Sequence, residues 1–127
     1  MTKNVFLALG LLASLGAVAL ALVPAQAGPE IPADVQKVFK QHCVRCHTGP
    51  KPPKGLSVIP GKIASIIGAP SAEVPAVKLI EPGAPEASYL LKKVRREEGI
   101  AGKPMPPGRP LAAEEIQALE AWIAGLK

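Results

Sequence analysis

The sequence is poor in aromatic residues and in residues that bind metals. Its 127 residues include two phenylalanines, one tyrosine, one tryptophan, two cysteines, two histidines and two methionines. A small domain buries only about two-thirds of the surface that its unfolded chain exposes. With so few rings, we expect the core to need a bound group. A zinc site is disfavoured, because His42 and His47 lie beside the only two cysteines and no second ligand cluster follows.

Further absences limit the fold and the partners. No stretch alternates polar and apolar residues for long enough to predict a strand, and there is no internal repeat. The formal net charge is +5, and the basic run at residues 92–96 is followed at once by Glu97 and Glu98. Nucleic-acid binding needs a basic stripe with interleaved aromatic residues, so we interpret this run as a solvated helix face. A mildly positive surface suits an acidic protein partner.

The one long hydrophobic run lies at the N-terminus. Lys3 precedes the apolar residues 5–23, and Ala25-Gln26-Ala27 is a small-x-small cleavage site. These are the three parts of a secretory signal peptide. We therefore expect residues 1–27 to be removed, leaving one domain at residues 28–127.

The same run could instead stay as an anchor in the inner membrane, since about 20 apolar residues span a bilayer. Pro24 and the small residues at 25 and 27 favour cleavage. Either outcome predicts an exported domain, with no stable membrane insertion once the leader is removed. The length and composition exclude a multidomain enzyme, a polytopic membrane protein and a coiled coil.

Proline and glycine, by contrast, are abundant. The chain has 15 prolines and 12 glycines, concentrated in residues 49–61 and 99–110. Long irregular loops in a compact domain are usually functional. We expect these loops to be ordered by wrapping around a bound group.

Four segments between and around these loops carry apolar residues at helical spacing. They are residues 32–46, 61–67, 85 to the stop at Gly99, and 113–124. Pro32 suits a first helical position, and Glu114 and Glu115 suit the positive end of a helix dipole. The sequence predicts an all-α domain of about four helices with wide loops.

The motif that indicates chemistry is Cys43-Val44-Arg45-Cys46-His47, at the end of the first predicted helix. Two cysteines three apart, followed by histidine, are typical of covalent haem attachment. On a helical turn the two thiols can reach the two vinyl groups along one haem edge, and the imidazole can bind iron from the proximal face. Export agrees with this, because the attachment takes place outside the bacterial inner membrane.

Two other interpretations of the cysteines remain. Cys43 and Cys46 could form a plain disulfide in an oxidising compartment, which would make the protein a small colourless exported domain. A thioredoxin-like dithiol would need a βαβ pattern around the motif, and the sequence has none. The signal peptide in front of the motif favours haem.

Iron in haem has a second axial position, for which Met105 is the candidate. It is the one methionine after the leader, on the proline-rich loop Gly-Lys-Pro-Met-Pro-Pro-Gly at residues 102–108. A thioether opposite imidazole favours ferrous iron and raises the reduction potential. The alternative is a loop methionine that merely covers the haem. His42 cannot reach the face opposite His47, so we expect it to be shielded by the haem edge or the last helix.

With these residues the domain resembles class I cytochrome c, and within it the small bacterial mono-haem domains. The matching parts are Gly55-Leu56, the segment PGAPEASYLL at residues 82–91, Met-Pro-Pro at 105–107, and Trp122-Ile123. The resemblance covers nearly all of residues 31–127. It implies about four helices with long Pro/Gly-rich loops wrapped around one covalent haem c, with His47 and Met105 as axial ligands.

The resemblance implies further details. The first and last helices should cross, which would place Phe39 near Trp122. A backbone carbonyl should hold the other ring nitrogen of His47, and the prolines after the motif are the candidates: Pro50, Pro52, Pro53 and Pro60. Ala112 departs from the pattern, because a Ser or Thr helix cap is usual there.

The predicted function is a periplasmic electron carrier rather than an enzyme, because both axial positions are filled and no acid–base pair accompanies Met105. Two alternatives keep the haem. The chain could be the cytochrome subunit of a periplasmic dehydrogenase or oxidase complex, or a haem-based ligand sensor in which Met105 dissociates. Two interpretations apply to Lys51, Lys54, Lys62 and Lys103. For any one of them a scattered solubilising lysine is favoured, and the alternative is that together they surround the haem edge and attract acidic protein redox partners.

Overall fold

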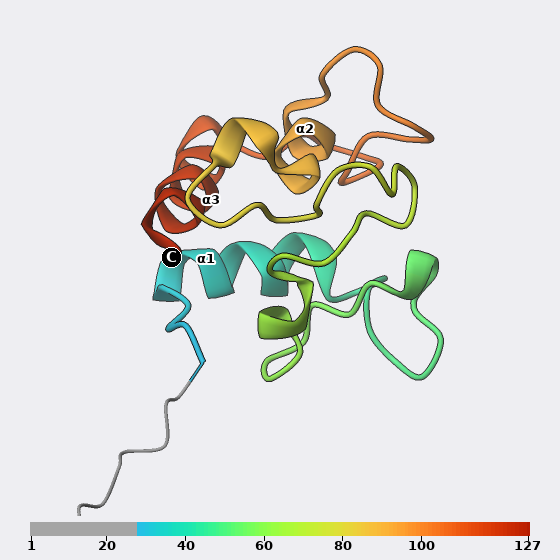
Figure 1. Cartoon of the computed structure of the whole chain (residues 1–127). Helices are drawn as coiled ribbons and strands as arrows, with labels where there is room; N and C mark the ends of the chain where they lie inside the picture. The colour runs from blue at the N-terminus through green and yellow to red at the C-terminus, as the bar shows by residue number, and fades with distance from the viewer. Residues whose placement is uncertain (1–27) are drawn as a thin grey trace, which may run out of the picture.

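The computed structural model describes residues 28–127, and the predicted signal peptide and its cleavage site lie outside them. The described part is all-α, as predicted. Its three α-helices are α1 (Ala33–Val38), α2 (Tyr89–Arg95) and α3 (Ala113–Gly125) (Figure 1). Over this range the extended pairing is limited to two isolated bridges. Among residues 28–127 we find no helix with the length and hydrophobicity to cross a bilayer.

The first predicted helix changes type before the cysteine motif. α1 ends at Val38 and continues as a π-helical turn, η1 (Phe39–Cys43). Its wider spacing appears in the bond from the Val44 N–H to the Phe39 carbonyl, at 2.9 Å. Single π-helical turns inside helices are often found at functional sites.

The prediction of a helix at residues 61–67 is wrong. Only a 3-10 turn forms there, η3 (Ile63–Ile66). Gly61 and Gly68 on either side have φ angles of +82° and +72°, in the left-handed region. The two breaks leave only six residues between them, fewer than two turns of α-helix, and helix initiation is costly over so short a stretch.

The third predicted helix starts later and ends earlier than expected. Residues Pro85–Ala87 form a 3-10 turn, η4, and Ser88 is extended. The buried Ser88 hydroxyl accepts a hydrogen bond from the Glu81 N–H at 2.9 Å and lies 3.0 Å from the Ala84 carbonyl. These bonds fix a bend, so that α2 begins at Tyr89. It ends at Arg95, because the next residue, Arg96, is left-handed with φ +60°. Residues 28–127 therefore contain three α-helices rather than about four.

The core lies where α1 crosses α3, and α2 also packs against α3 (Figure 1). Phe39 meets Trp122 edge to face, with ring centroids 5.9 Å apart. Leu119 and Ile123 on α3 are fully buried beside them. The predicted contact between the first and last helices is confirmed. Figure 1 shows the C-terminus beside the start of α1 and the long loops gathered toward the far end of that helix.

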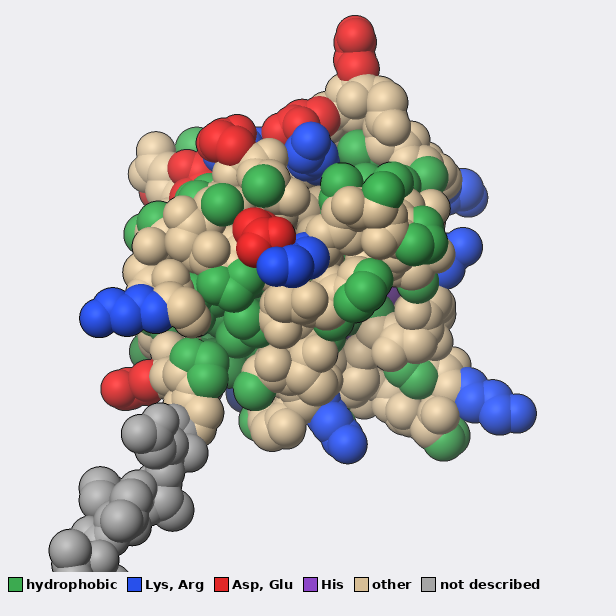
Figure 2. All heavy atoms as spheres, in the orientation of Figure 1, with side chains coloured by type: hydrophobic (Ala, Val, Ile, Leu, Met, Phe, Trp, Pro, Cys, Tyr) green, Lys and Arg blue, Asp and Glu red, His purple; other side chains and the backbone are tan. Residues whose placement is uncertain are grey.

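Charged side chains on the face drawn in Figure 2 are dispersed, with acidic groups among the basic ones. On α2, Arg95 shows why the charges at residues 92–98 do not form a basic stripe. Its guanidinium donates to Glu86 at 2.7 Å and to Glu120 at 2.6 Å, and these bonds raise its pKa. Part of the basic run is thus neutralised by carboxylates.

Candidate functional site

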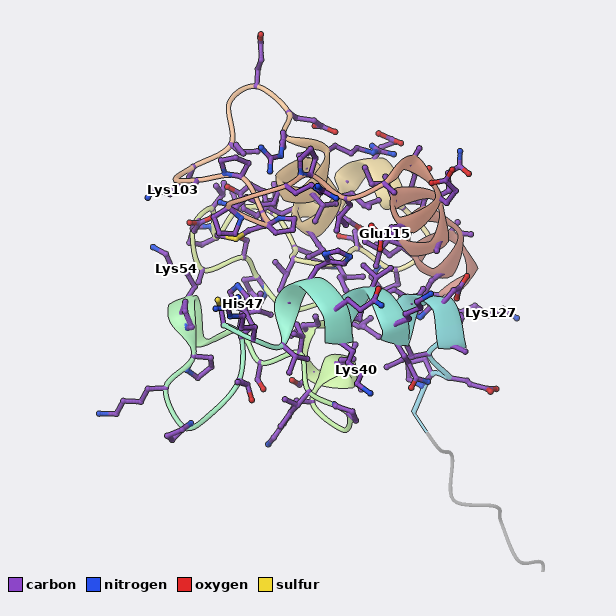
Figure 3. The ribbon with its side chains drawn as sticks, turned by 180° about the vertical axis from the view of Figure 1, so that it is seen from behind. Lys40, His47, Lys54, Lys103, Glu115 and Lys127 are labelled. Carbon is purple, nitrogen blue, oxygen red and sulfur yellow. The ribbon has the colours of Figure 1, made fainter. Side chains whose placement is uncertain are left out.

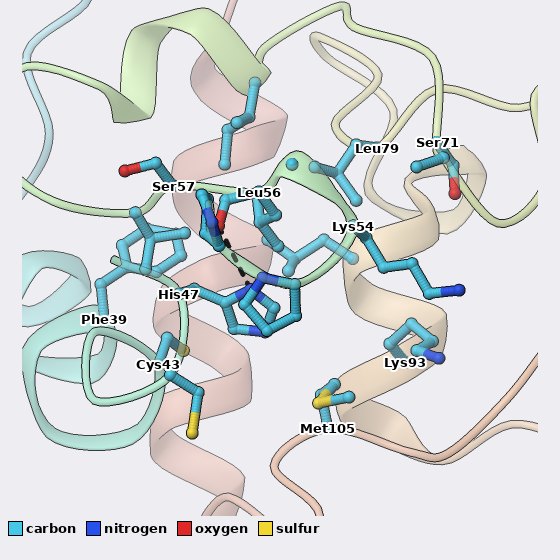
Figure 4. A pocket seen from close by; sticks show the side chains of 18 of the residues that line it. Phe39, Cys43, His47, Lys54, Leu56, Ser57, Ser71, Leu79, Lys93 and Met105 are labelled. Atoms are coloured by element: carbon cyan, nitrogen blue, oxygen red, sulfur yellow. Dashed lines mark hydrogen bonds between the residues drawn. The ribbon is translucent and has the colours of Figure 1, made fainter. Parts of the chain in front are cut away.

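A cavity of about 790 Å³ lies between η1, the loops that follow it, α2 and the loop at residues 103–107. Pockets for cofactors and other ligands span roughly 300–1,000 Å³. Apolar side chains dominate its walls: Phe39, Leu56, Val58, Ile66, Leu79, Leu90 and Val94. All four predicted site residues line it as well: Cys43, Cys46, His47 and Met105. Figure 4 shows the imidazole of His47 and the thioether of Met105 in this one pocket, with Cys43 beside them.

The cysteine motif lies on one tight turn. The Cys46 and His47 N–H groups both donate to the Cys43 carbonyl, at 3.1 and 2.9 Å. Cys43 is half-buried and Cys46 exposed, and the two thiols are not joined to each other. Local hydrogen bonding therefore brings two thiols and an imidazole to the same cavity.

The environment of Cys43 argues against a dithiol redox site. Burial raises the pKa of its thiol to about 11, and the negative charge of Glu115 adds to this. Reactive cysteines have lowered pKa values instead. The zinc interpretation also lacks support, because residues 28–127 contain no group of three or more His, Cys, Asp or Glu side chains able to hold a metal ion.

His47 is oriented by the backbone. Its Nδ1 lies 3.3 Å from the Leu56 carbonyl oxygen, the bond drawn as a dashed line in Figure 4. A carbonyl only accepts hydrogen bonds, so Nδ1 carries the proton and donates. In the neutral ring the lone pair is then on Nε2, as a metal-ligating histidine requires.

The carbonyl that holds His47 belongs to Leu56. The prediction of a proline carbonyl, from Pro50, Pro52, Pro53 or Pro60, is therefore wrong. The chain turns back at η2 (Pro53–Gly55), where Gly55 has φ +69°. Beyond this turn the Val58 N–H donates to the His47 carbonyl at 3.1 Å. That bond aligns the two segments and brings the intervening Leu56 carbonyl to the ring.

Met105 is half-buried on a loop that we define as the methionine loop, residues 101–108. Its N–H donates to the Lys93 carbonyl on α2 at 3.1 Å. Arg96 donates from Nη2 to the Pro106 carbonyl at 2.8 Å, and also to the Gly108 carbonyl. The loop is thus bonded along the end of α2, which places Met105 at the cavity.

The hydrogen bond between His42 and Glu115 argues against His42 as a second histidine ligand. Its Nε2 lies 2.7 Å from Glu115 Oε1 on α3, and both side chains are partly buried. The expected shielding by the last helix is therefore found. The Ala112 N–H bond, and after it the bond to His42, hold the pKa of Glu115 below its usual range.

Sequence reasoning missed three polar residues that line the cavity, namely Glu73, Tyr89 and Lys93. Lys93 was predicted to lie on a solvated face, and this is wrong, because it is only 6% exposed. One feature of the sequence could have shown that the two residues lie together: Tyr89 and Lys93 are four residues apart, and so share one face of a helix. Their acidic partner, Glu73, comes from a distant loop with no periodic pattern.

The donor set fits one haem. Two unjoined thiols, an imidazole with its lone pair on Nε2 and a thioether all line an apolar cavity of suitable volume. No protein-family model, no curated protein and no solved structure matches the chain. Assignment of a function therefore depends on the chemistry of these residues.

Proposed function

We propose that the chain is an exported c-type cytochrome of the class I kind, which carries single electrons between protein partners in the periplasm through one covalent haem c. One observation supports it above the others. His47, with Nδ1 bonded to the Leu56 carbonyl, and Met105, from a loop far along the chain, line the same apolar cavity as both cysteines. Imidazole and thioether are the axial ligands of cytochromes c.

Each residue has a distinct role in this proposal. The thiols of Cys43 and Cys46 would hold the haem covalently, and His47 and Met105 would bind its iron. Bound haem supplies an iron that gains and loses one electron. The apolar walls exclude water, and the bond to Leu56 keeps the imidazole in one orientation. Because the protein supplies both axial donors, no position is left for a substrate, which favours a carrier over an enzyme.

The lysines around the cavity support a partner with an acidic surface. Lys54, Lys62 and Lys103 line the cavity, whereas Lys51 does not. Figure 3 shows Lys54 and Lys103 on the same side of the molecule as His47. A docked acidic partner would therefore approach close to the cavity, and its association rate should fall as salt is added.

Intact mass and a visible spectrum of protein from the periplasm test the proposal. The full chain is expressed in a host with haem-ligation machinery, beside a Cys43→Ala/Cys46→Ala control. We expect residues 28–127 plus one haem and a low-spin spectrum. Colourless protein of the haem-free mass contradicts the proposal. A mass that includes residues 1–27 indicates the anchored form, and rapid carbon monoxide binding to the reduced protein indicates a ligand sensor.

A further inference from the structure

Lys93 is a buried cation with no established task. Its side chain is more than nine-tenths buried, and its ammonium donates to Glu73 Oε2 and to the Ala101 carbonyl, both at 2.7 Å. Tyr89, one helical turn earlier, accepts a hydrogen bond from the Ala101 N–H at 2.9 Å. The start of the methionine loop is therefore bonded to α2 through both peptide groups of Ala101.

The same lysine also bonds the loop through its backbone. Its carbonyl accepts the Met105 N–H at 3.1 Å. Lys93 thus contacts the loop at Ala101 through its side chain and at Met105 through its main chain. The three residues between these points leave the loop little freedom to move the thioether relative to the cavity.

Gly102 shows how closely the loop lies on this ion pair. It has φ +66°, and a Cβ added there would be 2.9 Å from Glu73 Oε1 and 3.8 Å from Lys93 Nζ. Any other residue would be strained by its backbone and would also displace the carboxylate. The loop, Glu73 and Lys93 are therefore packed as one unit.

Stability alone is a weak explanation for this arrangement. Burying an ammonium and a carboxylate carries a desolvation penalty that their attraction only partly offsets, and apolar replacements are often as stable. What a buried, directional pair adds is a defined geometry. The cavity is lined by Lys93, Glu73, Tyr89 and Met105. The pair therefore imposes its geometry at the place where the sixth iron ligand is needed.

We propose that Lys93, paired with Glu73, is a positioning residue that keeps the Met105 thioether on the haem iron. This inference depends on the proposed function. Lys93 does not bind the iron itself, and it acts by restraining the loop at Ala101 and Met105. Without that restraint the thioether leaves the iron more often, and an added ligand can take its place.

The chain contains a matched control in Arg95. It is on the same helix and bonds Glu86 and Glu120, but it does not line the cavity. Lys93→Met and Arg95→Met each remove one ion-paired cation from α2. Only the first removes a contact with the methionine loop.

The test measures binding of added imidazole to the ferric holoprotein, the sulfur-to-iron absorption band, and amide exchange of residues 101–108. In Lys93→Met we expect imidazole affinity to rise about tenfold or more, the band to weaken and exchange of the loop to accelerate. Lys93→Arg should recover part of the band. Met105→Ala gives the limit for a fully open site. Equal changes in Lys93→Met and Arg95→Met would overturn the proposal.

If Lys93→Met fails to fold, two milder variants test the same proposal. Tyr89→Phe and Glu73→Gln weaken the same contacts, and both should raise imidazole affinity above that of Arg95→Met. Wild-type affinity in both variants would overturn the positioning role. Wild-type protein that matures without haem instead refutes the proposed function, and with it any ligand role for the loop. Exchange at residues 101–108 then still reports whether Lys93 restrains it.

Discussion

At the scale of single residues, the chemistry of the site depends on which atom of each donor remains available. Nδ1 of His47 is committed to the Leu56 carbonyl, which leaves Nε2 for a metal. Nε2 of His42 is committed to Glu115 instead. Two histidines in one short segment therefore have different roles because their partners differ, although the residue type is the same.

If the proposed haem is bound, Met105→Ala should leave its iron with a single protein ligand. We expect the reduction potential to fall, since a thioether stabilises ferrous iron, and carbon monoxide to bind the reduced protein readily. Potentiometric titration and carbon monoxide binding check this against wild type. An unchanged potential together with an unchanged sulfur-to-iron band would show that Met105 is not the sixth ligand.

Glu115→Gln should make stability less dependent on acid. The folded-state pKa of Glu115 lies below its ordinary value of 4.5, so its contribution is fully present above about pH 4.5. It is lost as the pH falls through the lower folded value. Glutamine can still accept the Ala112 N–H but does not titrate. Urea unfolding between neutral pH and pH 3 should show a shallower loss in the variant, and parallel curves would contradict this.

At the scale of elements, most differences between the predicted and the observed helices lie at the helix ends. α3 was predicted to within one residue of its observed end, because its apolar spacing and acidic first turn are local features. The predicted helices at residues 32–46 and from residue 85 were altered by a π-helical turn and by the bend at Ser88. The bend is fixed by the hydrogen bonds that the Ser88 hydroxyl forms with the Glu81 N–H and the Ala84 carbonyl, and the π-helical turn by the bond from the Val44 N–H to the Phe39 carbonyl. The spacing of apolar residues does not register such bonds.

Ala112→Ser should stabilise α3. Ala112 is the N-cap and has no side-chain oxygen, so the helix has only the reciprocal bond from the Ala112 N–H to Glu115, at 2.9 Å. A serine there can accept the Glu115 N–H and complete a capping box, worth about 1 kcal/mol. Chemical denaturation should show a higher midpoint. Ala113→Ser, one residue inside the helix, is the control and should not stabilise.

At the scale of the whole molecule, the domain has two unequal parts. The α1–α3 crossing has its own core around Phe39 and Trp122. The part beyond it surrounds a cavity of about 790 Å³ and is built largely from loops. Three aromatic residues over residues 28–127 leave that second part dependent on what fills the cavity.

Preventing attachment of the proposed haem should therefore affect the two parts differently. In Cys43→Ala/Cys46→Ala, we expect faster amide exchange across residues 49–80 and 99–110, while α1 and α3 stay more protected. An attached haem would stabilise the folded state through the apolar contacts and iron ligands that it has only there. Thermal unfolding should thus begin well below that of the holoprotein. Equal stability with and without haem would contradict a structural role for it.

The sequence by itself determined the all-α class, the position of α3 and four of the residues that line the cavity, Cys43, Cys46, His47 and Met105. The class and α3 follow from helical spacing, and three of the four residues follow from a motif whose members are adjacent in the chain. The contact between Phe39 and Trp122 was expected from the resemblance rather than from spacing. Only the tertiary structure decided that Leu56 orients His47, that Lys93 is buried against Glu73, and that residues 61–67 do not form a helix. The reasons are physical. Lys93 and Glu73 are 20 residues apart, so no local pattern pairs them, and the bond from His47 to Leu56 depends on how the chain folds back at η2. At residues 61–67 the left-handed backbone of Gly61 and Gly68 outweighs the helical spacing of the apolar residues between them.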